Sequence, residues 1–120
     1  DFYHFDRAKR SADLWGSRAD WVMPDQMAEA TPIELKARDG LPLHGYLTTP
    51  LGRDAKGLPL VVLPHGGPHQ VRDTWAFDLE RQLLAARGYA VLQVNFRGSD
   101  GYGGAFEAAG YREWGGAMQD

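Results

Sequence analysis

An apolar run that ends in a His-Gly-Gly-Pro turn is the part of this chain best suited to chemistry. The run occupies residues 60–63, and the turn occupies residues 65–68. Because glycine lacks a Cβ, two glycines after a strand let the backbone approach a ligand and point its N–H groups outward. Donors held in this way stabilise the negatively charged oxygen that develops during acyl transfer. The sequence therefore predicts part of an acyl-transfer site at this turn.

Ser99 is a candidate nucleophile, but the residues around it in the sequence do not suit that role. A serine nucleophile on a sharp strand-to-helix bend needs small residues two positions before and after it. Gly101 meets this requirement, whereas Arg97 does not, and no histidine follows to act as the base. We therefore expect Ser99 to make hydrogen bonds within its own loop.

The histidines do not predict a metal site. His65 and His69 have the i, i+4 spacing of a zinc-binding helix, but two glycines and a proline separate them and cannot form that helix. His4 and His44 are interpreted as structural. The glycines near Ser99 match neither a dinucleotide-binding nor a phosphate-binding pattern. We expect neither a metal nor a cofactor.

A strand, a helix and a second strand are predicted to position the turn. The unbroken apolar run at residues 60–63 is typical of a strand covered on both faces. A helix is predicted over residues 75–87, and a second strand over residues 89–94. This order is typical of a βαβ unit, and such sheets bind ligands beyond the carboxyl ends of their strands. The His-Gly-Gly-Pro turn and the glycine-rich turn at residues 97–104 both lie at those ends.

Capping residues give the expected limits of the helix. Asp73 or Thr74 can cap its start, and Gly88 is placed to end it. Its apolar residues recur at helical spacing, namely Ala76, Leu79, Leu83 and Ala86.

Two antiparallel hairpins are predicted before this unit. Residues 2–5 and 11–15 form two short strands around a polar turn, and residues 16–30 form a polar linker. Alternating apolar residues at 33, 35 and 37 indicate a half-buried strand, which Asp39-Gly40 turns into a strand over residues 43–49.

Composition excludes several classes of function. The 120 residues fit one ordinary domain, and the formal net charge of −3 argues against nucleic-acid binding. No apolar stretch is long enough to span a membrane. The absence of cysteine excludes disulfides and fits a reducing compartment, so we expect a cytoplasmic location.

Four segments carry motifs that are specific in their order and spacing. They are residues 59–68, residues 82–92, residues 95–99 with 101–103, and residues 113–116 with Met118 and Asp120. In these motifs the sequence resembles the prolyl oligopeptidase family of serine peptidases, in particular its acylaminoacyl-peptidase and dipeptidyl-peptidase branch. The resemblance covers residues 31–120.

The resemblance implies an α/β fold, namely the first half of an α/β-hydrolase domain preceded by the tail of a β-propeller blade. Residues 1–25 would be the end of the propeller and a linker, and residues 26–120 the N-terminal half of the hydrolase domain. The strands from residue 31 onward would lie in the spatial order first, second, fourth, third. The catalytic serine, acid and histidine of the family would follow beyond residue 120, so the chain alone is expected to be inactive.

The resemblance also assigns roles within the turn. Gly67 would supply an oxyanion-stabilising N–H, with Gly66 as the second candidate and His65 as support for the loop. The parent protein would hydrolyse short peptides through an acyl-enzyme, with the rest of its own chain as the other partner. The sequence leaves the oligomeric state open, a homo-oligomer included. An esterase or dienelactone-type hydrolase of the same fold, or a non-catalytic module, stays an alternative.

Overall fold

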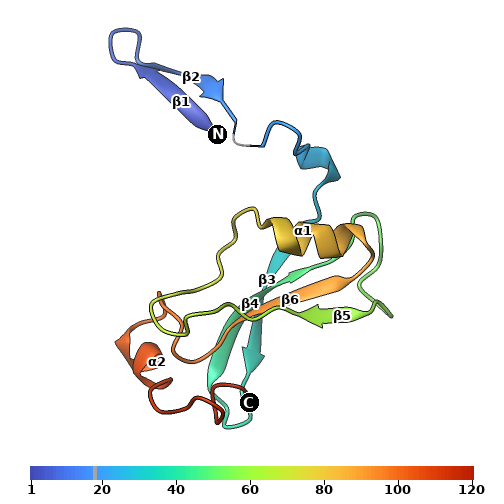
Figure 1. Cartoon of the computed structure of the whole chain (residues 1–120), viewed down its shortest axis with the longest axis vertical. Coiled ribbons are helices and arrows are strands. Elements are labelled where there is room, and N and C mark those ends of the chain that lie inside the picture. The colour runs from blue at the N-terminus through green and yellow to red at the C-terminus, as the bar shows by residue number, and fades with distance from the viewer. Residues whose placement is uncertain (18) are drawn as a thin grey trace.

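The computed structural model of the chain describes residues 1–17 and 19–120, in which an N-terminal hairpin stands apart from a larger α/β unit (Figure 1). The strands are β1 (Phe2–Asp6), β2 (Ser11–Gly16), β3 (Ala30–Lys36), β4 (Pro42–Thr48), β5 (Leu60–Val62) and β6 (Ala90–Asn95). The helices are the 3-10 turn η1 (Pro24–Gln26), α1 (Leu79–Ala86) and α2 (Gly104–Ala108).

The N-terminal hairpin forms as the sequence predicts. Strands β1 and β2 pair antiparallel, and Asp6 accepts hydrogen bonds from two backbone N–H groups of the connecting turn. Most of its large apolar side chains are exposed, among them Trp15 at 84%. The linker predicted over residues 16–30 contains η1, and its Arg18 lies outside the described residues.

The larger sheet has the strand order β3-β4-β6-β5. Strand β4 pairs antiparallel with both β3 and β6, whereas β5 pairs parallel with β6. This order confirms the prediction of first, second, fourth, third. It also confirms the βαβ unit, in which α1 connects β5 to β6.

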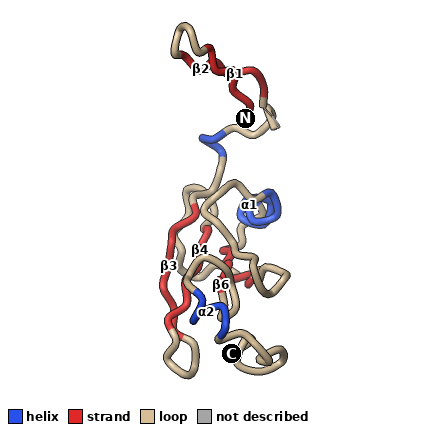
Figure 2. The backbone as a smooth tube through the Cα atoms, turned by 90° about the vertical axis from the view of Figure 1, so that its left-hand side faces the viewer, coloured by secondary structure: helices blue, strands red, loops and turns tan. Residues whose placement is uncertain are grey.

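The two helices pack against opposite faces of the sheet. Consecutive residues of a strand point to opposite faces. Gln93 accepts a hydrogen bond from Arg81 of α1, whereas Val94 packs with a buried cluster that contains Phe106 of α2. Figure 2 shows α1 to one side of the strands.

Helix α1 begins later than the sequence predicts. Its N-cap is Asp78, whose extended backbone stops the helix and whose carboxylate accepts the Arg81 N–H at 2.7 Å. The predicted caps, Asp73 and Thr74, lie before the helix, and residues 75–77 are not helical. Gly88 ends the helix as predicted, with φ +94° and an N–H that donates to Ala85 O.

Strand β5 is more exposed than its apolar run predicts. Leu60 and Val62 are 55% and 56% exposed. The reason is that β5 lies at the edge of the described sheet and is hydrogen-bonded to β6 alone. Leu79 and Leu83 of α1 are also exposed, whereas the side chains that α1 buries are Arg81 and Ala85.

Candidate active-site loop

The glycines after β5 present two free backbone donors. Gly66 and Gly67 are exposed, and neither N–H donates to a protein acceptor among the described residues. Gly67 has φ +132°, a conformation that favours glycine. A Cβ at Gly67 would also lie 3.1 Å from Val71 Cγ2. The backbone shape that exposes these donors therefore depends on glycine at position 67.

His65 contacts the turn that follows β6. Its ring stacks on Phe96, with centroids 4.5 Å apart and planes at 16°. Its Nε2 lies 2.8 Å from Ser99 Oγ, and its Nδ1 lies 2.9 Å from Gly66 O. The side chain thus joins the Gly66-Gly67 loop to the neighbouring strand end.

The Ser99–His65 contact looks like a nucleophile and its base but cannot act as one. Ser99 is completely buried, so a substrate cannot reach its hydroxyl. The hydroxyl donates its single proton to Phe96 O at 2.6 Å. The second nitrogen of His65 faces a backbone carbonyl, not the carboxylate that would orient a catalytic histidine. Ser99 therefore makes hydrogen bonds within its loop, as its sequence context predicts.

A buried polar network fixes the chain just after the glycine loop. Asn95 accepts the Asp73 N–H at 2.8 Å and donates to Asp73 O at 3.1 Å, and it also donates to Tyr102 Oη at 2.9 Å. The Asp73 carboxylate accepts from Gln93 Nε2 at 3.1 Å. Burial raises the pKa of the Asp73 carboxyl above its ordinary value, although the nearby His65 works in the opposite direction.

A hollow of about 570 Å³ opens beside the glycine loop. The loop forms one wall, and side chains from distant segments form the other, namely Phe96, Trp114 and Met118. No local pattern connects these three residues to residues 65–68, so the sequence predicts no site role for them.

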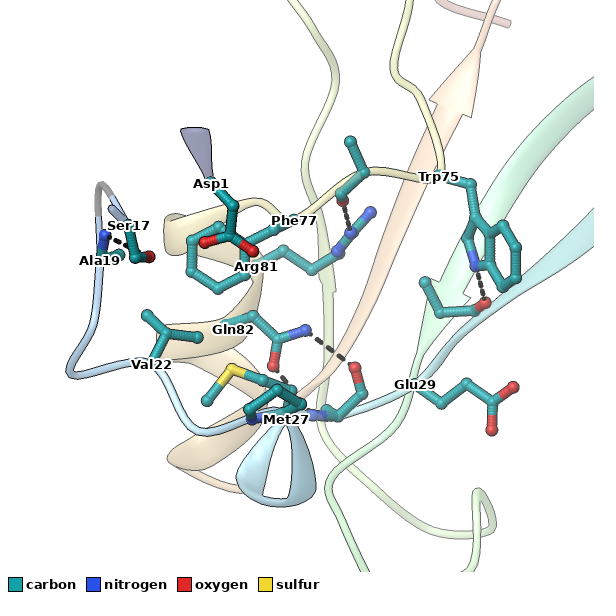
Figure 3. A pocket seen from close by; sticks show the side chains of 14 residues that line it. Asp1, Ser17, Ala19, Val22, Met27, Glu29, Trp75, Phe77, Arg81 and Gln82 are labelled. Carbon is teal, nitrogen blue, oxygen red and sulfur yellow. Dashed lines mark hydrogen bonds between the residues drawn. The ribbon is translucent and has the colours of Figure 1, made fainter. Parts of the chain in front are cut away.

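A larger cavity of about 750 Å³ lies elsewhere, between a wall from Ser17 and residues 19–30 and a wall from residues 75–82 (Figure 3). No residue of the glycine loop lines it, so size alone does not mark the site. Two side chains tie its walls together. Gln82 exchanges hydrogen bonds with the backbone of Ala28, and Trp75 Nε1 donates to Ala30 O at 2.6 Å.

Neither a metal centre nor a membrane-crossing helix emerges from the described part of the chain. Within residues 1–17 and 19–120, no three acidic or histidine side chains gather as a metal site requires. None of the helices described for these residues is long and apolar enough to cross a bilayer.

The chain is similar in sequence to proteins of one peptidase family. Residues 75–120 match the sequence profile of the Prolyl oligopeptidase family. Dipeptidyl aminopeptidase BIII of Pseudoxanthomonas mexicana is 40% identical over 99% of this chain. The human acylamino-acid-releasing enzyme is 50% identical over 74% of it. These matches confirm the family resemblance seen in the sequence.

Solved structures give the same result for the fold. Puromycin hydrolase superposes on 95% of this chain with a TM-score of 0.76 and 32% identity. An acylaminoacyl peptidase complexed with Z-Gly-Gly-Phe-chloromethyl ketone covers 77% of the chain with a TM-score of 0.67 and 32% identity. The fold is that of the α/β hydrolases. The chain spans 18% of the dipeptidyl aminopeptidase, 11% of the human enzyme and 18% of puromycin hydrolase.

Proposed function

Because this chain is related to the serine peptidases of the prolyl oligopeptidase family, we propose that it supplies the oxyanion-binding loop of a serine peptidase. The observation that carries the proposal is the pair of exposed N–H groups at Gly66 and Gly67, which have no protein acceptor in the described residues. They follow a parallel strand, at the sheet edge where such folds bind ligands.

The proposed reaction is hydrolysis of short peptides through an acyl-enzyme. A serine hydroxyl attacks the peptide carbonyl while a histidine takes its proton, and the carbonyl oxygen becomes negatively charged. The Gly67 N–H donates to this oxygen, with Gly66 as the second candidate, and His65 supports the loop. The C–N bond then breaks, the histidine returns its proton to the leaving amine, and water hydrolyses the acyl-enzyme.

Other parts of this proposal concern sequence outside the 120 residues. We propose that the nucleophile, acid and base lie there, since Ser99 is buried and its proton is engaged. The exposed apolar side chains of the β1–β2 hairpin support its assignment to a propeller blade, with residues 1–25 as blade end and linker and residues 26–120 as hydrolase domain.

The direct test removes the Gly67 N–H without moving the backbone. Gly67→Pro is unsuitable, because proline requires φ near −65° whereas Gly67 has φ +132°. Gly67→Ala is also unsuitable, because its Cβ would crowd Val71. Semisynthesis of the full-length peptidase with glycolic acid in place of Gly67 exchanges only the amide N–H for an ester oxygen.

The ester at position 67 should lower kcat on a peptidyl p-nitroanilide about 100-fold or more, with little change in KM. The same replacement at Gly66 is the matched control and should have a much smaller effect. If the larger loss falls on Gly66, the donor is Gly66. If neither ester changes kcat, the loop does not bind the oxyanion.

A substrate panel tests the kind of reaction. A peptidase should cleave dipeptidyl or N-acetylaminoacyl p-nitroanilides, whereas an esterase of the same fold should cleave only p-nitrophenyl esters. A full-length protein that no fluorophosphonate labels would be a non-catalytic module.

A further inference from the structure

His69 anchors the exit of the glycine loop to segments far along the chain. Its ring meets Tyr111 edge-on, with centroids 4.8 Å apart, and lies 6.4 Å from the Trp114 ring. On another side it lies against the backbone of Gly98, where a Cβ would be 3.3 Å from ring atoms Cε1 and Nδ1. The half-buried imidazole thus lies between the turn after β6 and residues 110–114.

The ring makes these contacts through its aromatic faces and edges. Its Nδ1 is buried without a hydrogen-bond partner in the described part of the chain. A hydrogen bond to Nδ1 therefore does not explain the position of the imidazole. Packing against Tyr111, Trp114 and the bare backbone of Gly98 does.

His69 is close enough to the donor glycine to influence its position. His69 stands two residues after Gly67, and a Cβ at Gly67 would lie 3.4 Å from His69 N and 3.1 Å from Val71 Cγ2. The segment from His69 to Val71 therefore lies directly beside Gly67, and a displacement of this segment would change the position of the glycine.

The loop is thus held at two points. His65 fixes its entry by stacking on Phe96 and by its contact with Ser99. His69 fixes its exit on Gly98 and Tyr111. Both anchors reach the chain that follows β6, so the two glycines lie between fixed points.

We propose that His69 is a positioning residue, whose aromatic packing holds the Gly67 N–H in the direction that the oxyanion requires. This inference rests on the proposed function and extends it to a residue outside the His-Gly-Gly-Pro turn. A misplaced donor weakens binding of the transition state more than binding of the substrate, so loss of His69 affects kcat and leaves KM largely unchanged.

The test compares His69→Ala and His69→Phe in the full-length peptidase. The alanine variant should lower kcat about 10- to 100-fold while KM stays within about threefold. The phenylalanine variant keeps an aromatic ring without imidazole nitrogens, and it should restore kcat to within about threefold of the native value. Titration with a fluorophosphonate counts folded active sites, so kcat is expressed per competent molecule.

Either of two results would overturn the role of His69. One is a native kcat for His69→Ala, and the other is a phenylalanine variant at least tenfold slower than the native enzyme. If the alanine variant does not fold, the phenylalanine variant alone decides. The ester at Gly67 separates this failure from failure of the proposed function. A slow Gly67 ester with a native-like His69→Ala removes only the positioning role, whereas native kcat for both the Gly66 and the Gly67 esters removes the proposed function as well.

Discussion

The side-chain amide of Asn95 forms two hydrogen bonds with the backbone of Asp73, in the way that neighbouring strands of a sheet pair. The Asn95 amide accepts the Asp73 N–H at 2.8 Å and donates to Asp73 O at 3.1 Å. Asn95 is fully buried at the end of β6, whereas Asp73 is half-buried. Asp73 lies six residues after Gly67, and this pair therefore fixes the segment that follows the glycine loop.

Asn95→Ala should destabilise the fold strongly. It leaves both backbone groups of the half-buried Asp73 without these partners, and an unpaired buried group costs about 1–3 kcal/mol. Tyr102→Phe is the matched control, because it removes only the hydroxyl that accepts from Asn95 Nδ2. Urea unfolding measures both variants. An alanine variant no less stable than the phenylalanine variant would show that the Asp73 bonds contribute little.

Asp73→Asn should stabilise the protein at neutral pH. Burial raises the pKa of this carboxyl above its ordinary value of 3.8, and His65, Asp78 and Arg81 are the charged groups that act on it. The folded state then binds a proton more tightly than the unfolded state, so stability falls as pH rises through the window above 3.8 and stays lower beyond it.

Asparagine carries no charge, so its advantage should be present at pH 7 and should disappear below about pH 4. Urea unfolding of both proteins across this range gives the difference directly. An advantage that grows as the pH falls would reverse the sign and contradict the burial argument.

Ser99 in the isolated 120-residue chain should resist labelling by a fluorophosphonate. Its hydroxyl is completely buried and donates to Phe96 O. The same chain should not hydrolyse chromogenic peptides above background. Mass spectrometry of the treated chain is the measurement, with a full-length peptidase as the positive control. A phosphonylated peptide containing Ser99 would make it a nucleophile.

Asp78→Ala should cost about 1 kcal/mol of stability, because the Arg81 N–H loses its cap. Asp78→Ser keeps an oxygen at this position and should recover most of the loss. Thr74→Ala tests one of the two cap positions that the sequence predicts, and it should have little effect. Equal losses for Asp78→Ala and Thr74→Ala would place the functional cap earlier in the chain.

Val62→Lys should make the isolated chain less prone to self-association. Val62 is 56% exposed on β5, whose outer edge has no hydrogen-bonded neighbour in the described sheet. A lysine on an open edge discourages pairing with a second chain. In a full-length hydrolase that covers this strand, the same lysine should reduce stability. Sedimentation velocity of the native and variant chains compares their association, and a native chain that is a stable monomer would contradict the prediction.

Local pattern was enough to predict the strands, the two hairpins and helix α1, but not the complete strand order or the helix cap. Alternation identified β3, and the apolar runs identified β5 and β6, because these periods reflect the backbone itself. The strand order came from the family resemblance. The helix cap was misplaced because Asp73, Thr74 and Asp78 can all cap a helix, and tertiary partners decide among them. Asp73 is held by Gln93 and Asn95, two polar residues whose burial no local pattern reveals.

In the candidate site too, some residues could be predicted from local sequence and others could not. Two glycines after a strand predict free donors, because their effect on the backbone is local. The residues that pack on the flanking His65 and His69 come from far along the chain, namely Phe96, Tyr111 and Trp114. Their distance from Gly67 in space depends on the fold, so a search for spaced motifs cannot find them.

Because β6 lies between β4 and β5, the pairing of β5 is delayed during synthesis until β6 has been made. Strand β3 can pair with β4 as soon as both leave the ribosome, because a short turn joins them. Strand β5 pairs with β6, whose first residue comes roughly 30 residues later. At about 5–20 residues per second, this is a wait of about 1.5 to 6 seconds. During that time the apolar residues of β5 are exposed in the nascent chain, so slow translation between residues 63 and 89 would prolong the opportunity for chaperones or other nascent chains to bind them.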